Sequence, residues 1–198
     1  MSSSFSMKSI DNIVDSALAE HLRLSNEVTV LKSQLSDASR ICISALQNGS
    51  KLLICGNGGS AADAQHIASE LVGRFTADRP PIAAISLSSD TSILTSVAND
   101  FSFSTVFLRQ ILALGQAGDV LLTISTSGNS QNCILAAEEA KSMSLRTIAF
   151  LGKDGGKLKD IVDLPLIVPS DSTARIQEMH ILFAHIICLS IESSLFPV

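Results

Sequence analysis

The sequence lacks tryptophan and tyrosine, and eight phenylalanines are all that it has of the large aromatic side chains. Proteins that bind single-stranded nucleic acid stack bases on aromatic side chains and hold the backbone with clustered basic residues. The sequence has 14 Lys and Arg residues and 19 Asp and Glu residues, which gives a net charge of −5. The basic residues do not cluster. We therefore expect no nucleic-acid partner.

Cysteine is also scarce and scattered. The four cysteines are Cys42, Cys55, Cys133 and Cys188, and no two of them form a Cys-x-x-Cys pair. This spacing suggests neither a thiolate zinc site nor a disulfide framework. We expect all four thiols to be reduced and buried.

Long apolar runs are missing as well. A membrane-spanning helix needs about 18 consecutive apolar residues, and no stretch of this sequence reaches that length. The first residues lead into Asp11 and Asp15 without the apolar core of a signal peptide. We therefore expect a cytoplasmic protein with no membrane partner.

Hydrophobic residues are abundant, at 46% of the chain, while charged residues make up only 17%. Parallel strands that are covered by helices on both faces explain such a balance. A chain of 198 residues fits one domain with one core. We expect a disordered tail over residues 1–8 and a single domain over residues 9–198 that includes two N-terminal helices.

The apolar pattern predicts the order of the elements. Apolar residues recur at helical spacing from Ile10 to Leu22 and again from Leu31 to Leu46, where Asn48-Gly49 is typical of a helix end. Five short apolar runs then alternate with helical segments, at residues 51–55, 82–87, 120–124, 146–151 and 164–168. This alternation predicts an α/β fold with a doubly wound, five-stranded parallel sheet. An N-terminal helical extension and a long C-terminal helix complete it.

The last predicted helix, over residues 173–195, is apolar nearly all round. A helix without a polar face is usually buried on several sides. A core of this size cannot easily surround so long a helix, so we expect a subunit interface and a homo-oligomer.

Two polar loops each follow an apolar run and precede a helical one. They are Cys55 to His66 (Cys-Gly-Asn-Gly-Gly-Ser-Ala-Ala-Asp-Ala-Gln-His) and Ser125 to Ser130 (Ser-Thr-Ser-Gly-Asn-Ser). In a parallel sheet such loops place free backbone N–H groups of helix N-termini beside hydroxyls, which suits an anion. Ser and Thr also cap ordinary helices, but four hydroxyl residues among six favour a phosphomonoester.

The segment Gly56-Asn-Gly-Gly-Ser-Ala61 also matches the loose dinucleotide pattern G-x-G-x-x-A. A dinucleotide site needs an acidic residue about 20 positions later, at the end of the next strand. The nearest candidate, Asp90, comes considerably later, so the pattern disfavours a nucleotide.

Several polar side chains have the spacing of a metal site. His66 and Glu70 are four residues apart and share one helix face, which is compatible with a metal or with an ion pair. Gln177, His180 and His185 interrupt the apolar last helix, where unpaired polar groups would be costly. Hydrogen bonding in the core and ligation of an ion shared with the first loop's helix both remain open.

These segments combine into one pattern: Gly56 to Ser60, His66 with Glu70, Asn99-Asp100, Ser125 to Ser130, and Arg175 to His185. The pattern resembles the phosphoheptose isomerases of the sugar isomerase (SIS) superfamily, over nearly all of the chain after the tail. The fold implied is flavodoxin-like or Rossmann-like. The activity implied is conversion of sedoheptulose 7-phosphate to D-glycero-D-manno-heptose 7-phosphate, by cytosolic homotetramers that supply heptose to lipopolysaccharide or other surface glycans. Ser102 departs from the glycine of many relatives.

The resemblance also implies roles for individual residues. It implies one Zn²⁺ per subunit, with His66, Glu70, Gln177 and His185 as its ligands. It implies substrate contacts at Asn57, Gly58, Gly59, Glu70, Asn99, Asp100, Ser125, Thr126, Ser127, Ser130 and Gln177. Glu70 and His185 are the implied acid and base.

The isomerisation moves a proton between C1 and C2 through an enediol, so it needs a positioned base and a group that polarises or protonates the oxygen. A carboxylate that binds Zn²⁺ tightly loses basicity, so the two roles implied for Glu70 compete. Our hypothesis is that ligation by Glu70 is loose, that Glu70 shuttles the proton, and that zinc organises the site or polarises oxygens.

Two alternatives share the fold. One is a non-catalytic sugar-phosphate-binding regulator, such as the SIS protein that assists the bacterial replication initiator, which resembles this chain at Arg175 to His180 and Leu195 to Pro197. That group lacks the counterparts of Glu70 and His185, so the pair favours an enzyme. The other is an isomerase of arabinose, hexosamine or hexulose phosphates, which share the phosphate end. Asn99-Asp100 is our candidate for binding the extra hydroxyls of a heptose.

Overall fold

The computed structural model describes residues 9–197, so the tail that we expect over residues 1–8 lies outside the described residues. The strands are β1 (Leu52–Gly56), β2 (Ala84–Ser86), β3 (Val120–Ser125), β4 (Arg146–Gly152) and β5 (Leu164–Val168). The α-helices are α1 (Ile10–Glu27), α2 (Lys32–Gln47), α3 (Gly59–Val72), α4 (Thr91–Asp100), α5 (Val106–Leu114), α6 (Gln131–Ser142), α7 (Leu158–Ile161) and α8 (Thr173–Leu195). Two short 3₁₀ turns, η1 (Val28–Leu31) and η2 (Phe103–Thr105), precede α2 and α5.

The five strands form one parallel sheet in the order β2-β1-β3-β4-β5. The predicted doubly wound, five-stranded parallel sheet is therefore confirmed. This is the flavodoxin-like order, and its direction of winding reverses between β1 and β3. The two polar loops follow these two strands, so they leave the sheet at the point where ligands bind in such folds.

The second strand is shorter than the pattern predicts. Its apolar run covers residues 82–87, but the ladder with β1 pairs only Ala84 to Ser86. The residues before the strand explain why it is short. Pro80 and Pro81 carry no backbone N–H, and the N–H of Ile82 donates to the carbonyl of Leu71 at the end of α3, 3.0 Å away. The first residue of the run is therefore hydrogen-bonded to α3 and not to the sheet.

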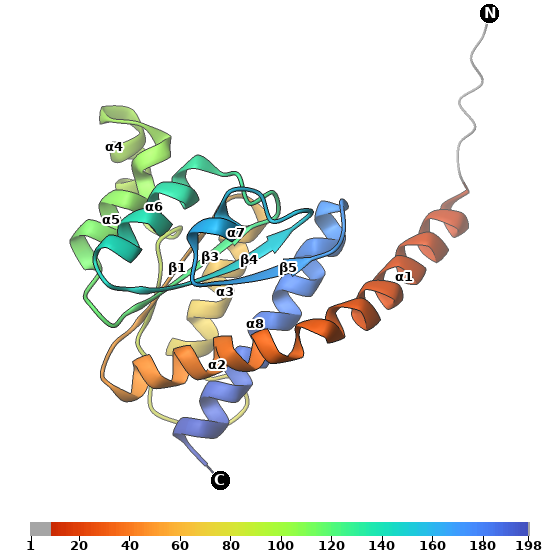
Figure 1. Ribbon diagram of the computed structural model, residues 1–198, viewed down its shortest axis with the longest axis horizontal. Coiled ribbons are helices and arrows are strands. Elements are labelled where there is room, and N and C mark those ends of the chain that lie inside the picture. The colour runs from red at the N-terminus through yellow and green to blue at the C-terminus, as the bar shows by residue number, and fades with distance from the viewer. Residues whose placement is uncertain (1–8, 198) are drawn as a thin grey trace, which may run out of the picture.

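Helices cover both faces of the sheet (Figure 1). Side chains alternate along each strand, so that Leu52 and Ile54 point to one face while Leu53 and Cys55 point to the other. The first face packs against α2, α3 and α8, and the second against α4, α5, α6 and α7. The three inner strands, β1, β3 and β4, are consequently buried on both sides almost throughout, which accounts for much of the hydrophobic composition.

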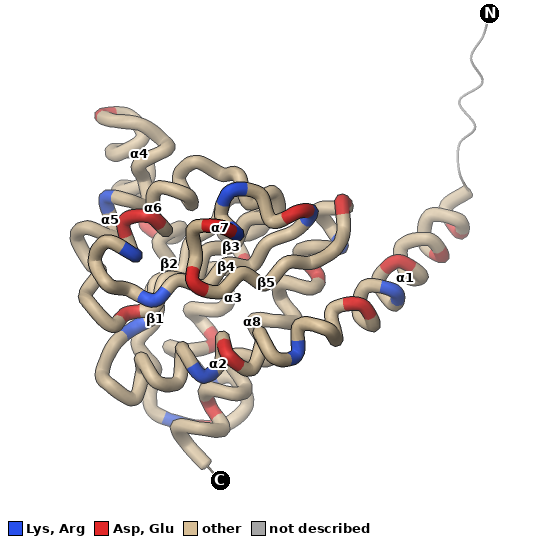
Figure 2. The backbone as a smooth tube through the Cα atoms, in the orientation of Figure 1, with Lys and Arg blue, Asp and Glu red and all other residues tan. Residues whose placement is uncertain are grey.

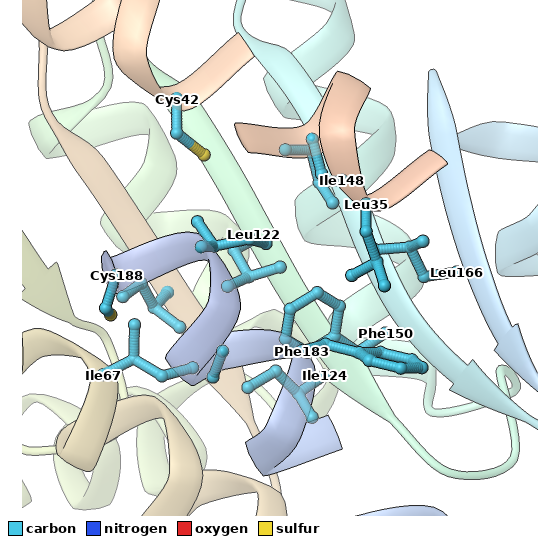
Figure 3. Close-up of a cluster of buried hydrophobic side chains, with 14 of the residues drawn as sticks. Leu35, Cys42, Ile67, Leu122, Ile124, Ile148, Phe150, Leu166, Phe183 and Cys188 are labelled. Atoms are coloured by element: carbon cyan, nitrogen blue, oxygen red, sulfur yellow. The ribbon is translucent and has the colours of Figure 1, made fainter. Parts of the chain in front are cut away.

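The centre of the first face is a close-packed cluster in which α8 meets the sheet (Figure 3). Phe150 of β4 and Phe183 of α8 stack edge to face, with ring centroids 5.8 Å apart. Cys42 of α2 and Cys188 of α8 flank the cluster. Together these contacts fix the last helix against the sheet.

All four cysteines are free and buried, as predicted. Burial raises the pKa of Cys42 to about 12, and it does the same for Cys188. These two side chains are therefore neutral thiols that behave as small apolar groups.

The first helix forms as predicted, but its apolar stripe is exposed. In Figure 1 α1 extends away from the rest of the fold. Its exposed apolar residues are Ile10, Ile13, Val14, Leu18 and Leu22, each at least 48% exposed. It is tied to the start of α8, because the Arg175 guanidinium donates to the carbonyl of Ala17 and His21 Nδ1 lies 2.7 Å from Glu178 Oε2.

The predicted C-terminal helix is confirmed as α8, which packs against α2, α3 and the sheet. Within residues 9–197, α8 is the one helix long and apolar enough to cross a membrane by length and composition, but 44% of its apolar window is buried inside the fold. Core helices pass the same test. Figure 2 shows few charged residues along it. Leu182, Ile186 and Leu189 form an apolar face that the described part of the chain leaves exposed.

His180 of α8 is a core residue whose hydrogen bond goes to β4. It is 1% exposed, and its Nε2 lies 3.0 Å from the carbonyl oxygen of Leu151, so Nε2 carries the proton. Its Nδ1 has no hydrogen-bond partner among the described residues. Burial lowers the pKa of His180 to about 4. Of the two interpretations, hydrogen bonding in the core holds for this histidine.

The buried His180 predicts a loss of stability in mild acid. The unfolded chain binds a proton at His180 as pH falls through about 6.5, whereas the folded chain does so only near pH 4. The free energy of unfolding should therefore decrease between pH 6.5 and 4. Urea unfolding at several pH values should give a flatter dependence for His180→Gln, whatever the absolute stability of the variant. The same slope in both proteins would contradict this assignment.

Candidate functional site

The loop after β1 presents the N-terminus of α3. Gly58 has a left-handed φ of +56°, which glycine adopts without strain, and α3 begins at the next residue. No side chain of the described residues caps α3, whereas Ser9 and Asp90 cap α1 and α4. The N–H groups of Ser60 and Ala61 already donate to the carbonyls of Asn57 and Gly58 at 3.0 Å, which leaves the N–H of Gly59, without an acceptor among the described residues, for a ligand.

The position of Asp90 bears on whether the glycine pattern of the first loop could bind a nucleotide. Its carboxylate accepts the N–H of Ile93 at 2.9 Å and so belongs to the first turn of α4. The acidic side chain that a ribose would need is thus committed elsewhere, and the glycine pattern is that of an anion loop.

The loop after β3 has the same character. Ser130 stands at the N-cap of α6 but makes no capping hydrogen bond, and its hydroxyl lies 3.2 Å from the hydroxyl of Ser125. The N–H of Gly128 donates to the Ser125 carbonyl and closes the turn. Because Ser130 does not cap the helix, the simple helix-capping alternative does not account for this loop.

A reciprocal amide pair fastens the two loops together. Asn57 Nδ2 donates to Asn132 Oδ1 at 2.9 Å, and Asn132 Nδ2 donates to Asn57 Oδ1 at 2.8 Å. Asn132 is 3% exposed and lies in the first turn of α6. The substrate contact predicted for Asn57 stays a prediction, and its side chain pairs with Asn132, a residue that the sequence analysis missed. Its place directly after the serine loop was the available signal.

A third loop, after β2, was also missed. The hydroxyl of Ser88 donates to the carbonyl of Gly56 at 2.9 Å, and the Gln65 amide lies 3.4 Å from the carbonyl of Ser88. Serines after a short strand are ordinary turn residues, so the sequence carried little signal for it. The contact supports the first loop from the side of β2.

Three side chains converge where the second half of α3 faces α8. His66 Nε2 lies 3.1 Å from His185 Nε2 and 3.4 Å from Glu70 Oε1. The ring of Phe75 packs against the ring of His185, with centroids 5.4 Å apart. One turn before His66, burial raises the pKa of the Asp63 carboxyl, and the charge of His66 acts in the opposite direction.

Gln177 of α8 lies against the start of α3. A Cβ atom on Gly59 would overlap the side-chain amide of Gln177, so only glycine at position 59 allows this approach. Of the four residues predicted as metal ligands, His66, Glu70 and His185 therefore lie together where the second half of α3 faces α8, and Gln177 faces the start of α3.

The donor set fits zinc, although the side chains contact one another directly. No group of three or more His, Cys, Asp and Glu residues within the part of the chain that the structure describes is placed to hold a metal. Two imidazoles, a carboxylate and an amide oxygen are nonetheless suitable ligands. Tetrahedral bonds of about 2.0–2.1 Å place ligand atoms roughly 3.3 Å apart, close to the 3.1 and 3.4 Å measured between His66 and its two neighbours.

Asn99 and Asp100 are not brought to this cluster. They lie exposed at the end of α4, where Asn99 Nδ2 donates to Asp100 Oδ1 at 2.8 Å. No hydrogen bond within residues 9–197 joins either of them to the other predicted site residues. Ser125, Thr126, Ser127 and Ser130 lie together in the loop after β3, and the role of all these residues remains a prediction.

Comparison with known proteins agrees with the geometry. The family model of the SIS domain matches residues 18–152. The phosphoheptose isomerase of a Nitratiruptor species is 53% identical over 182 residues, which are 91% of this chain and 97% of that protein. The solved phosphoheptose isomerase of Neisseria gonorrhoeae is 44% identical, with a TM-score of 0.89 over 93% of this chain and 100% of that one. That of Francisella tularensis is 40% identical, with a TM-score of 0.91 over 94% and 100%.

The chain therefore belongs to the SIS domain family, whose match includes β1, β3 and both anion loops. Identity of this level over nearly the whole of both chains narrows the class further. Within the family it is one of the phosphoheptose isomerases, which are enzymes that isomerise heptose phosphates.

The contact between Gly59 and Gln177 predicts a non-additive pair of substitutions. Gly59→Ala should displace the Gln177 amide at a small cost in stability, because the overlapping atoms are the far end of a flexible side chain that can turn away. In a Gln177→Ala background the same change should cost still less, because the overlapping group is gone. Thermal unfolding of the four members of the cycle measures this coupling. Additive costs would show that the two residues do not meet.

Proposed function

We propose that this protein converts sedoheptulose 7-phosphate to D-glycero-D-manno-heptose 7-phosphate. The observation that carries the proposal is the convergence of His66, Glu70 and His185 between α8 and the second half of α3, a helix whose N-terminus carries no side-chain cap. Isomerisation of a sugar phosphate requires an acid–base pair together with a site for the phosphate. The isomerase class of its relatives supports the same conclusion.

The phosphate would bind at the carboxyl ends of β1 and β3. The hydroxyls of Ser125, Thr126, Ser127 and Ser130 and the N–H groups of α6 would surround it, with the first turn of α3 nearby. Asn57, Gly58 and Gly59 would contribute through the backbone of the first loop, because the Asn57 side chain pairs with Asn132. No lysine is needed, since dipoles and hydroxyls suffice for a phosphomonoester.

Glu70 and His185 would carry out the proton transfers. Glu70 would take the proton from one of the carbons C1 and C2 and return it to the other, while His185 would donate to or accept from the adjacent oxygen. Both side chains lie within reach of His66, which would hold them in place. Asn99 and Asp100 would contact the distal hydroxyls if the end of α4 lies against a site in the assembled protein.

Zinc is part of the proposal, with one ion per subunit. His66, Glu70, Gln177 and His185 would hold it, and when bound it would act as a Lewis acid on substrate oxygens and organise the ligands. Loose ligation by Glu70 would leave that carboxylate basic enough to move a proton. Gln177 would also be free to contact the substrate.

The protein would work as a homo-oligomer, a tetramer by the resemblance, with residues 9–198 as one SIS domain. The exposed face of α8, together with η1 and α2, borders an apolar groove of about 560 Å³, and the stripe of α1 is a second exposed apolar surface. Val28, Leu35, Leu182, Phe183 and Ile186 line the groove. A second copy of the chain would cover these surfaces, and the enzyme would act in the cytoplasm, supplying heptose for lipopolysaccharide or other surface glycans.

Substitution of the acid–base pair tests the reaction. Glu70→Gln and His185→Gln should each lower kcat for sedoheptulose 7-phosphate by about 100-fold or more, because general acid–base catalysis contributes that much. Glu138→Gln, an exposed change on α6, is the matched control and should leave kcat unchanged. Added Zn²⁺ should raise turnover of the wild type more than that of His66→Gln.

Two results would contradict this scheme. Full turnover by Glu70→Gln would remove the proton shuttle. A wild-type protein that binds the sugar phosphate without converting it would instead favour the non-catalytic regulator.

Disrupting the apolar face of α8 tests the oligomer. The double variant Leu182→Glu, Ile186→Glu places two charges in the groove and should give a smaller particle by size-exclusion chromatography with light scattering. Leu112→Glu on α5, at a residue that is also exposed, serves as the comparison. A wild-type protein that is monomeric at micromolar concentration would refute the assembly.

A further inference from the structure

The most heavily hydrogen-bonded carboxylate outside the proposed site belongs to Glu192, near the end of α8. It is 3% exposed and accepts the backbone N–H groups of Phe75, Thr76 and Ala77 at 2.9 to 3.2 Å. The hydroxyl of Thr76 and the Nε of Arg79 also donate to it. One buried side chain of α8 thus organises the whole segment that follows α3.

The Glu192 carboxylate is charged at neutral pH. Burial by itself raises the pKa of Glu192, but the hydrogen bonds from Thr76, Ala77 and Phe75 act more strongly together and bring it down to about 2. The facing Arg79 is also buried, with a side chain that is 1% exposed. A buried ion pair of this kind is seldom needed for stability alone, because apolar residues fill such space at less cost.

Arg79 connects this carboxylate to the helix that carries Glu70. While its Nε donates to Glu192, its Nη2 donates to the backbone carbonyl of Glu70 at 2.7 Å and its Nη1 to that of Leu71 at 2.8 Å. These carbonyls lie in the last turn of α3, where helical partners are missing. The cation therefore caps α3 at the residue that would serve as the base.

The same carboxylate reaches the other proposed catalytic group through Phe75. Glu192 fixes the backbone N–H of Phe75, and the ring of Phe75 packs against the His185 ring at 5.4 Å. His185 and Glu192 lie seven residues, about two turns, apart on the same helix. The buried carboxylate of Glu192 thus supports both Glu70 and His185, the two groups proposed to transfer protons.

We infer that Glu192 and Arg79 are positioning residues that hold Glu70 of α3 in register with His185 of α8. The inference rests on the proposed function. A guanidinium is required because three donors in one planar fork must reach one carboxylate and two carbonyls. A small displacement of a base can cost 100-fold in rate.

The variants Arg79→Lys and Glu192→Gln test this role. Each should lower kcat for sedoheptulose 7-phosphate by about 10- to 100-fold while KM changes less than about threefold, because the phosphate loops after β1 and β3 do not contact this pair. Each should also weaken Co²⁺ binding, measured by visible absorption, by about 10-fold, as loss of groups that support metal ligands does.

The matched control is Asp119→Asn. Asp119 is an equally buried carboxylate that accepts from the N–H of Gln116 and from both the N–H and the ammonium group of Lys51, but at the amino ends of β1 and β3. It should lower the melting temperature without changing kcat or the affinity for Co²⁺. If Glu192→Gln behaves like this control, the Glu192 and Arg79 pair has only a structural role and the inference is wrong.

The two readouts separate this inference from the proposed reaction. A wild-type protein that binds Co²⁺ but does not convert the heptulose phosphate would overturn the reaction, and the Co²⁺ affinities of the variants would then decide the positioning role. A wild type that turns over without binding Co²⁺ would leave the decision to kcat. Failure of the wild type in both measurements would overturn both proposals.

Discussion

The pairing of β1 with β3 is the constraint on which the site depends. These strands are not consecutive in the sequence, and the winding direction of the sheet reverses between them. Their parallel ladder nevertheless places Gly56 opposite Ile124. Their carboxyl ends therefore open at one edge, and the two uncapped helices that follow aim their N-termini at a common space. A strand order that parted β1 from β3 would separate the loops. The reciprocal amides of Asn57 and Asn132 then remove the freedom that remains between them.

The contact between α3 and α8 adds chemistry to that anion site. Successive turns of α8 serve different ends: Gln177 and His185 face α3, His180 closes a core hydrogen bond with Leu151, and Glu192 anchors the segment after α3. Each of these four side chains thus lies against a residue of another element, although Nδ1 of His180 has no hydrogen-bond partner among the described residues.

Periodicity and loop composition predict much of this protein. The limits of α8 and the strands near residues 120, 146 and 164 follow from apolar runs, and the anion loops follow from Gly and Ser after buried strands. What could not be predicted depends on partners distant in sequence. An amphipathic stripe looks the same on α1, where it is exposed, as on α2, where it is buried. Arg79 and Glu192 are 113 residues apart, and no spacing rule joins them. In the sequence Asn132 looks like an ordinary helix residue, and only the structure shows that it pairs with Asn57.

The reactivity of the four buried thiols reports which part of the fold has opened. Cys42 and Cys188 lie in the cluster beneath α2 and α8, while Cys55 and Cys133 lie in the cluster on the opposite face of the sheet. Since a neutral, inaccessible thiol is inert to alkylation, each pair becomes reactive only when its own layer separates from the strands. The rates at which the two pairs are modified would therefore distinguish detachment of one helical layer from concerted unfolding of all three layers, without any engineered label.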